Sequence, residues 1–169
     1  MQIDFRELRK ADAPVALQGT VDLSRVAEEN QQVEAIEPVS VDLVAEMSND
    51  VVVVQGTLST TLTYQCSRCL EPYQTSVRLK FHELFADEEQ PGDEEVHVVT
   101  SHEVDLTPYL EETVNLAIEF QPLCSADCKG LCPACGADRN KEQCECDVSR
   151  PLDPRFAALE GLLSKDDSK

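Results

Sequence analysis

The stretch "VSVDLVAEMSNDVVVVQGTLSTTLTYQCSRC", residues 39–69, decides the fold. From Val39 to Met47 every odd position is apolar, and from Val54 to Tyr64 the apolar residues occupy even positions. A period of two is typical of strands that have one buried face and one wet face, and the Ser-Asn-Asp between the runs favours a tight turn. The stretch therefore predicts two antiparallel strands, the second of which ends at a C-x-x-C pair.

Further elements are predicted on both sides of this stretch. Apolar positions alternate again from Tyr73 to Phe81, which extends the pattern to a three-stranded antiparallel meander with one wet face. Residues 15–21 are expected to add a strand, and Ser24 is expected to cap a short helix that runs to Glu29.

Proline placement predicts two later helices. Thr107 as N-cap and Pro108 at the first helical position open one helix, which is expected to stop near Pro122. Asp153 and Pro154 open the other helix in the same way. The apolar faces of the two helices, which we expect to be core, consist of Leu110, Val114, Ala117 and Ile118 in the first and of Phe156, Leu159 and Leu163 in the second.

The charge of the chain is strongly negative and unevenly distributed. Its 169 residues include 33 acidic and 14 basic ones, which gives a formal net charge of −19. Residues 1–123 hold 24 acids and 7 bases, a formal charge of −17, whereas residues 124–169 are close to neutral at −2. Broad capture of a phosphate backbone by this surface is therefore not expected.

Six acids within residues 87–95 surround a Pro-Gly pair, which indicates a solvated loop. A calcium loop needs a central glycine, a closing glutamate and regular ligand spacing, and this segment lacks that spacing. We assign the loop no chemistry.

Eight cysteines pose the main functional question, because six of them lie within residues 124–146. The first residues show no basic segment followed by an apolar run, and no segment approaches the roughly 20 apolar residues that span a bilayer. We therefore expect a cytoplasmic protein without a membrane partner. In a reducing cytosol, thiolates held by a metal are favoured over disulfides.

The spacing of the cysteines predicts two four-thiolate zinc sites. A C-x-x-C at a hairpin tip is typical of a zinc knuckle, and Gly136 can take a positive φ after the pair Cys132/Cys135. We favour one local site in the tail and one site that ties the tail to the hairpin tip. In this pairing Cys132, Cys135, Cys144 and Cys146 form the local site, and Cys66, Cys69, Cys124 and Cys128 form the other. The competing pairing joins Cys66 and Cys69 with Cys132 and Cys135, and leaves Cys124, Cys128, Cys144 and Cys146 for the second metal.

Other chemistry is less favoured by the pattern. Thiolate cages also fit iron, while a redox C-x-x-C would need a βαβ context that is not predicted. His82, His97 and His102 show no metal-ligand spacing, and a solvated surface role is expected for each. No nucleophile elbow, phosphate loop or dinucleotide fingerprint is present, and a zinc with four thiolates has no open position, so we do not expect an enzyme.

The motifs together resemble the YceD family. The resemblance rests on Cys66-Ser67-Arg68-Cys69-Leu70, on the helix predicted after Asp105-Leu106, on Leu123 to Gly136 and on Asp153-Pro154-Arg155-Phe156, and it covers essentially the whole chain. Proteins of this family are described as large ribosomal RNA subunit accumulation proteins of bacteria and plastids. The resemblance implies a role in the synthesis, processing or stability of 23S rRNA and implies no known reaction.

Two functions follow as hypotheses. The first is a non-catalytic ribosome biogenesis factor that offers an acidic face to a large-subunit ribosomal protein, a pre-ribosomal particle or a processing enzyme. The second is a direct RNA-binding zinc protein. Its contact with rRNA would have to come through the few cations near the cysteines, which are Arg68, Lys129, Arg139, Lys141 and Arg150.

The predicted fold class is α+β, an antiparallel β-meander with a few helices and a cysteine-rich zinc-binding tail. We divide the chain into an acidic α+β domain at residues 1–123 with the C-x-x-C hairpin tip, a cysteine-rich zinc module at 124–150 and a C-terminal helix at 151–169. Two zinc ions per chain are expected.

Overall fold

The computed structural model describes residues 1–11, 13–87 and 96–146. The chain forms two compact units, Met1–Cys128 and a second unit that begins at Lys129. The helix predicted from Asp153 and all of the acidic loop except Asp87 lie outside the described residues.

All the named helices and strands of the described residues belong to the first unit. In chain order they are β1 (Gln2–Asp4), α1 (Phe5–Leu8), β2 (Val15–Val21), α2 (Ser24–Glu29), β3 (Val33–Ile36), β4 (Val39–Ser48), β5 (Val51–Gln65), β6 (Pro72–Ala86), β7 (Val96–Val98), β8 (Glu103–Asp105) and α3 (Thr107–Ala117).

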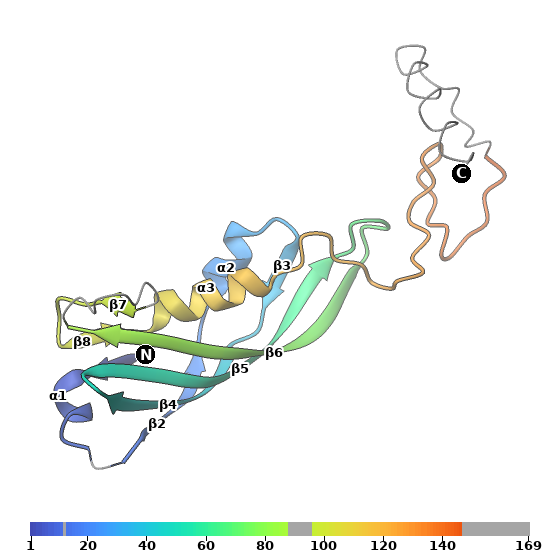
Figure 1. The fold of residues 1–169 in the computed structure, drawn as a ribbon. Helices are drawn as coiled ribbons and strands as arrows, with labels where there is room; N and C mark the ends of the chain where they lie inside the picture. The colour runs from blue at the N-terminus through green and yellow to red at the C-terminus, as the bar shows by residue number, and fades with distance from the viewer. Residues whose placement is uncertain (12, 88–95, 147–169) are drawn as a thin grey trace, which may run out of the picture. The chain divides into compact units, whose positions relative to one another are not determined.

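The predicted meander is confirmed as β4, β5 and β6, which pair antiparallel in sequence order (Figure 1). Asn49 and Asp50 join β4 to β5 with φ angles of 49° and 64°, the left-handed conformation that a two-residue hairpin turn of type I′ requires. The even positions of β5 predicted to face inward are buried, among them Leu58 and Leu62. The alternation of residues 39–69 thus fixes both the strands and their buried face.

The sheet is larger than the predicted meander. Six strands form it in the order β2-β4-β5-β6-β7, and β3 pairs with the far end of β5. The expected strand β2 and helix α2 are present with the predicted bounds. β3 and the parallel strand β7 were not predicted, and neither was the two-stranded sheet of β1 and β8, which joins chain segments about 100 residues apart.

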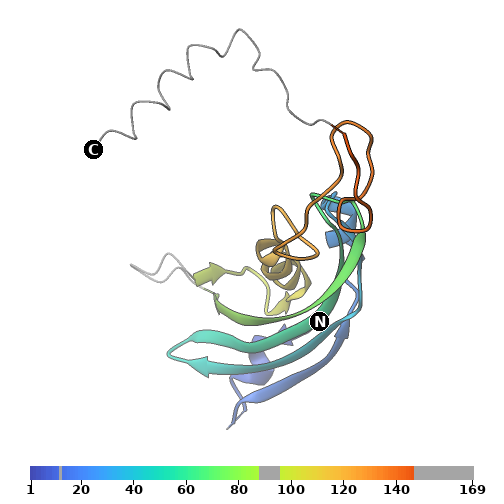
Figure 2. The ribbon, with the colours of Figure 1, turned by 90° about the vertical axis from the view of Figure 1, so that its right-hand side faces the viewer.

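The core lies between the main sheet and the elements that cover one face of it. Figure 2 shows the strands curving around α3 (yellow). Leu110 and Val114 of α3 are fully buried, and the ring of Tyr109 meets Phe85 of β6 edge-on with the centroids 4.9 Å apart. The α+β fold class predicted from the sequence is confirmed.

The helix ends differ from the prediction in detail. α3 begins at Thr107 and ends at Ala117, so the expected N-cap role of Thr107 and the stop near Pro122 are wrong. The carboxylate of Asp105 accepts the Thr107 N–H at 3.0 Å, and Asp22 accepts the Ser24 N–H at 2.9 Å in the same way. In both helices an aspartate two residues earlier thus accepts the N–H of the first helical residue, and the predicted N-cap role of Ser24 is wrong as well, because Leu23 precedes that helix as its N-cap.

At Gly56 the backbone of β5 lies close against the backbone of β4. A Cβ added there would collide with the carbonyl oxygen of Asp42 and would lie 2.8 Å from the Cα of Leu43. Only glycine lets the two backbones meet at this distance.

Candidate metal centres

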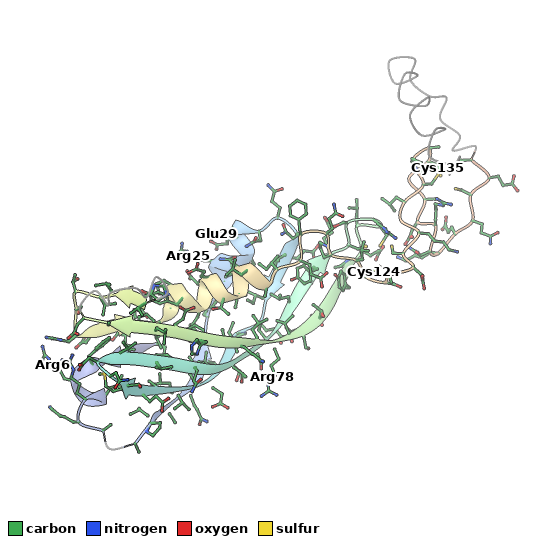
Figure 3. The ribbon with its side chains drawn as sticks, viewed as in Figure 1. Arg6, Arg25, Glu29, Arg78, Cys124 and Cys135 are labelled. Atoms are coloured by element: carbon green, nitrogen blue, oxygen red, sulfur yellow. The ribbon has the colours of Figure 1, made fainter. Side chains whose placement is uncertain are left out.

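Four cysteines of the first unit form one cluster, called cluster I: Cys66, Cys69, Cys124 and Cys128. Their sulfur atoms all lie within 4.8 Å of one another. Two of the separations are 3.6 Å, between Cys69 and Cys124, and 3.8 Å, between Cys66 and Cys128. Figure 3 shows Cys124 in the segment that follows α3, past the ends of β5 and β6. Cluster I therefore joins a hairpin tip to a segment about 55 residues later in the chain.

The spacing of cluster I fits a tetrahedral metal. Four sulfurs bound at about 2.3 Å to one zinc ion lie about 3.8 Å apart. A disulfide would bring two sulfurs to about 2.05 Å, and the structure records all eight cysteines as free. Cys66, Cys69 and Cys128 are at most 5% exposed, so a bound ion would be shielded from water on most sides.

Backbone hydrogen bonds hold the two halves of cluster I together. The Ser67 N–H donates to the carbonyl of Pro122 at 2.8 Å, and Nη1 of Arg68 donates to the carbonyl of Cys128 at 2.9 Å. Arg68 was considered in the sequence as a contact for RNA. Its guanidinium instead ties the hairpin tip to the second half of the cluster, a role that no sequence motif indicated.

The electrostatics of cluster I favour a single thiolate in the absence of a cation. Burial opposes ionisation of Cys66, but backbone N–H groups of Cys124, Cys69 and Arg68 donate to its sulfur and lower its pKa to about 6. The interaction with Cys69, together with burial, raises the pKa of Cys124 to about 12. A second thiolate so close to the first is costly, and a divalent cation would remove that cost.

The second unit contains a matching cluster, called cluster II: Cys132, Cys135, Cys144 and Cys146. Its sulfur atoms also lie within 4.8 Å of one another, and among them Cys132 is buried while Cys135 (Figure 3) is exposed. Backbone N–H groups of Cys135 and Ala134 lower the pKa of Cys132 to about 6. The side chain of Cys135 and burial raise the pKa of Cys146 to about 12. Cluster II thus repeats the charge pattern of cluster I.

The C-x-x-C pairs of the two clusters, Cys66/Cys69 and Cys132/Cys135, lie in turns with the same backbone conformation. In the hairpin tip the Leu70 N–H donates to the Cys66 carbonyl at 2.9 Å, and the Gly136 N–H donates to the Cys132 carbonyl at 2.8 Å. The residue after the second cysteine is left-handed in both, with φ 61° at Leu70 and 77° at Gly136. The positive φ predicted for Gly136 is confirmed. That a leucine takes the same conformation was not predicted, because its side chain makes this conformation unfavourable.

The structure groups the eight cysteines as the favoured pairing does and not as the crossed pairing does. Each group can hold one metal ion. Ligation of a metal by these residues remains a prediction, and so does the identity of the metal.

The other residues considered in the sequence as metal ligands or RNA contacts make structural contacts or lie outside the described residues. His97 differs from the expected surface role, because its Nε2 lies 2.7 Å from the Glu83 carboxylate and its ring packs against Phe85 and Tyr109. Lys141 lies 3.7 Å from the carboxylate of Asp138. Arg150 lies outside the described residues.

In the parts of the chain that are described, no helix is both long and apolar enough to cross a membrane.

Comparison with known proteins identifies relatives for most of this chain. The family model described as Large ribosomal RNA subunit accumulation protein YceD matches residues 54–163. An uncharacterized protein of Mycobacterium tuberculosis is 35% identical over 127 residues, which cover 72% of this chain and 60% of the relative's own length. The uncharacterized protein YlbN of Bacillus subtilis is 33% identical over 151 residues, which cover 88% of this chain and 87% of YlbN.

A plant relative carries the name of the family. The Arabidopsis thaliana protein described as Large ribosomal RNA subunit accumulation protein YCED homolog 1, chloroplastic, is 25% identical over 139 residues, which cover 64% of this chain and 43% of that protein. No solved structure matches the chain.

Proposed function

The chain belongs to the YceD family, and from this membership we propose that it is a non-catalytic ribosome biogenesis factor. It would support the synthesis, processing or stability of 23S rRNA, and it would act through protein partners. Two zinc ions would stabilise the protein. The proposal includes the division into an acidic domain, a cysteine-rich module and a C-terminal helix, and a cytoplasmic location.

The proposal that the protein is not an enzyme rests on one observation, the four-cysteine geometry of the two clusters. Each cluster offers four cysteine sulfurs that lie within 4.8 Å of one another, and the two separations known in cluster I, 3.6 and 3.8 Å, fit a tetrahedral site. A zinc ion held there would supply a rigid cross-link and would have no free position for water or substrate. The chain's own contribution is to fix the ligands, through the N–H groups that donate to Cys66 and Cys132.

The charge supports a protein partner. Residues 1–123 carry a formal charge of −17, which repels phosphate and attracts the basic proteins of the large subunit. Of the cations that direct RNA binding would need, Arg68 donates to Cys128 and Lys141 lies beside Asp138. We therefore favour a large-subunit ribosomal protein, a pre-ribosomal particle or a processing enzyme over naked rRNA.

A binding comparison tests the proposal. The purified protein is expected to bind a precursor particle of the large subunit more tightly than naked 23S rRNA, and its association is expected to slow as salt rises from about 50 to 300 mM. Surface plasmon resonance with each immobilised target measures both. Tight, saturable binding of naked rRNA that is lost in Arg139→Gln/Lys141→Gln would instead support the direct RNA-binding zinc protein.

A further inference from the structure

The outer edge of β2 has the features of a strand-binding site. Within the described residues β2 pairs with β4 alone, and its other edge makes no backbone hydrogen bond to any of them. Figure 2 shows β2 (blue) at one rim of the curved sheet. An edge strand of seven residues leaves a row of backbone donors and acceptors open to another chain.

This edge lacks the usual protection against pairing. Natural proteins guard exposed edges with charged residues, prolines or bulges. The sequence of β2, VALQGTV, contains no charge and no proline, and its pairing with β4 runs without a register shift. The strand is therefore open to pairing, in a protein in which 28% of the residues are charged.

The core is also incomplete beside this edge. Val15 and Leu17 lie opposite Ala45 and Leu43, which are fully buried, so their side chains belong to the core face of the sheet. Yet both remain half-buried, because no further strand of the described part of the chain lies beside them. One more strand would bury them and thereby gain hydrophobic stabilisation.

A small pocket opens between β2 and the segment formed by β1 and α1. Its volume is about 80 Å³, and its lining consists of Gln2, Ile3, Asp4, Glu7, Leu8, Val15 and Leu17. Small-molecule sites usually measure roughly 300 Å³ or more, so this pocket suits a single side chain of a peptide. In strand addition, main-chain hydrogen bonds supply affinity and such pockets select alternate side chains.

The charges near the outer edge of β2 indicate which kind of strand would bind there. Among the described residues, the pocket lining has two charged members, Asp4 and Glu7, and the charged residues of β4 are Asp42 and Glu46. Of the cations in and just after α1, Arg9 is paired with Asp87 at 2.7 Å, and Arg6 and Lys10 offset only part of these four acidic charges. A strand that carries basic residues is therefore attracted, whereas a second copy of this acidic chain is repelled.

We propose that β2 accepts an extended segment of another protein, in which apolar and basic residues alternate, as a seventh strand of the sheet. One apolar side chain of this segment enters the pocket beside Leu17, and the backbone of the segment pairs with β2. This site is independent of the two cysteine clusters and of the proposed role with rRNA.

A defined peptide tests the site on the full-length protein. The probe is acetyl-Lys-Val-Lys-Val-Lys-Val-Lys-amide, and its control is the same peptide with every internal amide N-methylated, which keeps the charge but cannot pair. Binding of the first peptide at about 150 mM salt is expected to shift the amide signals of residues 15–21 in NMR spectra and to slow their hydrogen exchange. The methylated peptide is expected to bind at least about tenfold more weakly.

Two variants with the same change of charge locate the contact. Leu17→Lys places an inward-pointing charge at the pocket and is expected to weaken peptide binding by about tenfold. Gln18→Lys adds the same charge on the opposite face of β2, where Gln18 now donates to Asp42 at 2.9 Å, and is expected to change binding by no more than about twofold. The comparison of the two peptides uses only the natural protein, so it tests the site even if the Leu17→Lys variant does not fold.

Several results would overturn the site. These are equal binding of the methylated peptide, amide changes that lie away from β2, and no binding at millimolar peptide. A dimer that protects the β2 amides in the absence of peptide would assign the edge to a second copy instead. None of these results bears on the binding of the protein to a precursor particle.

Discussion

At the scale of single residues, the addition of one methyl group at Gly56 is expected to lower the stability of the protein strongly. In Gly56→Ala the new Cβ would strike the backbone of Asp42 and Leu43, which cannot move without opening the β4–β5 ladder. We expect a loss of about 2 to 3 kcal/mol in the free energy of unfolding. Urea unfolding followed by circular dichroism measures it.

The matched control for this change is Gly19→Ala in β2. There the added Cβ would meet only the Cε of Met1 at 3.5 Å, an ordinary contact, so stability is expected to stay the same or rise slightly. Equal losses in the two variants would mean that strand propensity, and not the close approach at Gly56, determines the effect.

Gly136 tests the left-handed turn of cluster II. A Cβ at this position would have nothing within 4 Å, so the cost of Gly136→Leu is conformational and not steric. We expect about 1 to 2 kcal/mol, seen as a roughly 5- to 30-fold weaker zinc affinity of cluster II in a chelator competition. Ala134→Leu adds the same exposed side chain to the same turn and is expected to leave the affinity unchanged. Comparable losses of zinc affinity in Gly136→Leu and Ala134→Leu would contradict a conformational cause.

At the scale of elements, the two clusters hold different parts of the chain. Cluster I ties the tip of the β5–β6 hairpin to the segment after α3, while cluster II lies within the second unit. Closing the longer loop removes more freedom from the unfolded chain, so the loss of cluster I should cost the first unit more.

Cysteine substitutions measure this difference. Elemental analysis is expected to find two zinc ions in the natural protein and one in either Cys69→Ser or Cys135→Ser. Cys69→Ser should lower the stability of the first unit by about 3 kcal/mol, whereas Cys135→Ser should leave the thermal unfolding of β4, β5 and β6 unchanged. Iron, or a single metal in the natural protein, would contradict the zinc assignment. Equal global unfolding in both variants would contradict the separate roles.

The elements also show how far the sequence could predict the fold and the candidate site. β4 and β5 were predictable because their alternation and their turn are local features. β7 and β3 were not, because strands of three and four residues carry too little pattern, and their partners are chosen by the tertiary fold. The grouping of the cysteines followed from spacing, but the hydrogen bond from Arg68 to Cys128 depends on how two distant segments meet.

At the scale of the whole molecule, the negative charge is expected to control the rate of association with a basic partner. Replacing the acids of residues 88–95 (Glu88, Glu89, Asp93, Glu94 and Glu95) with the corresponding amides removes five of the 33 acidic charges. Asp87 is kept, because it pairs with Arg9. We expect association with the precursor particle to slow by about fivefold and binding of naked rRNA to strengthen slightly.

The control exchanges glutamate and aspartate at the same five positions, which keeps every charge. Its association rate is expected to match that of the natural protein. If the exchange slows association as much as the amides do, the side chains themselves make contact and long-range charge is not the cause.

The pairing of β1 with β8 has a consequence for the synthesis of the protein. Gln2, Ile3 and Asp4 find their partners only at residues 103–105, and the cysteines of cluster I are complete only at Cys128. At about 5 to 20 residues per second, a nascent chain waits on the order of 5 to 20 s between the appearance of β1 and that of β8. Until then Ile3 lacks its strand partner Val104, and the Phe5 N–H lacks the His102 carbonyl to which it donates at 2.8 Å in the finished protein. β1 thus cannot pair before β8 has been made, and a translational pause after Cys128 would favour correct folding more than an earlier pause.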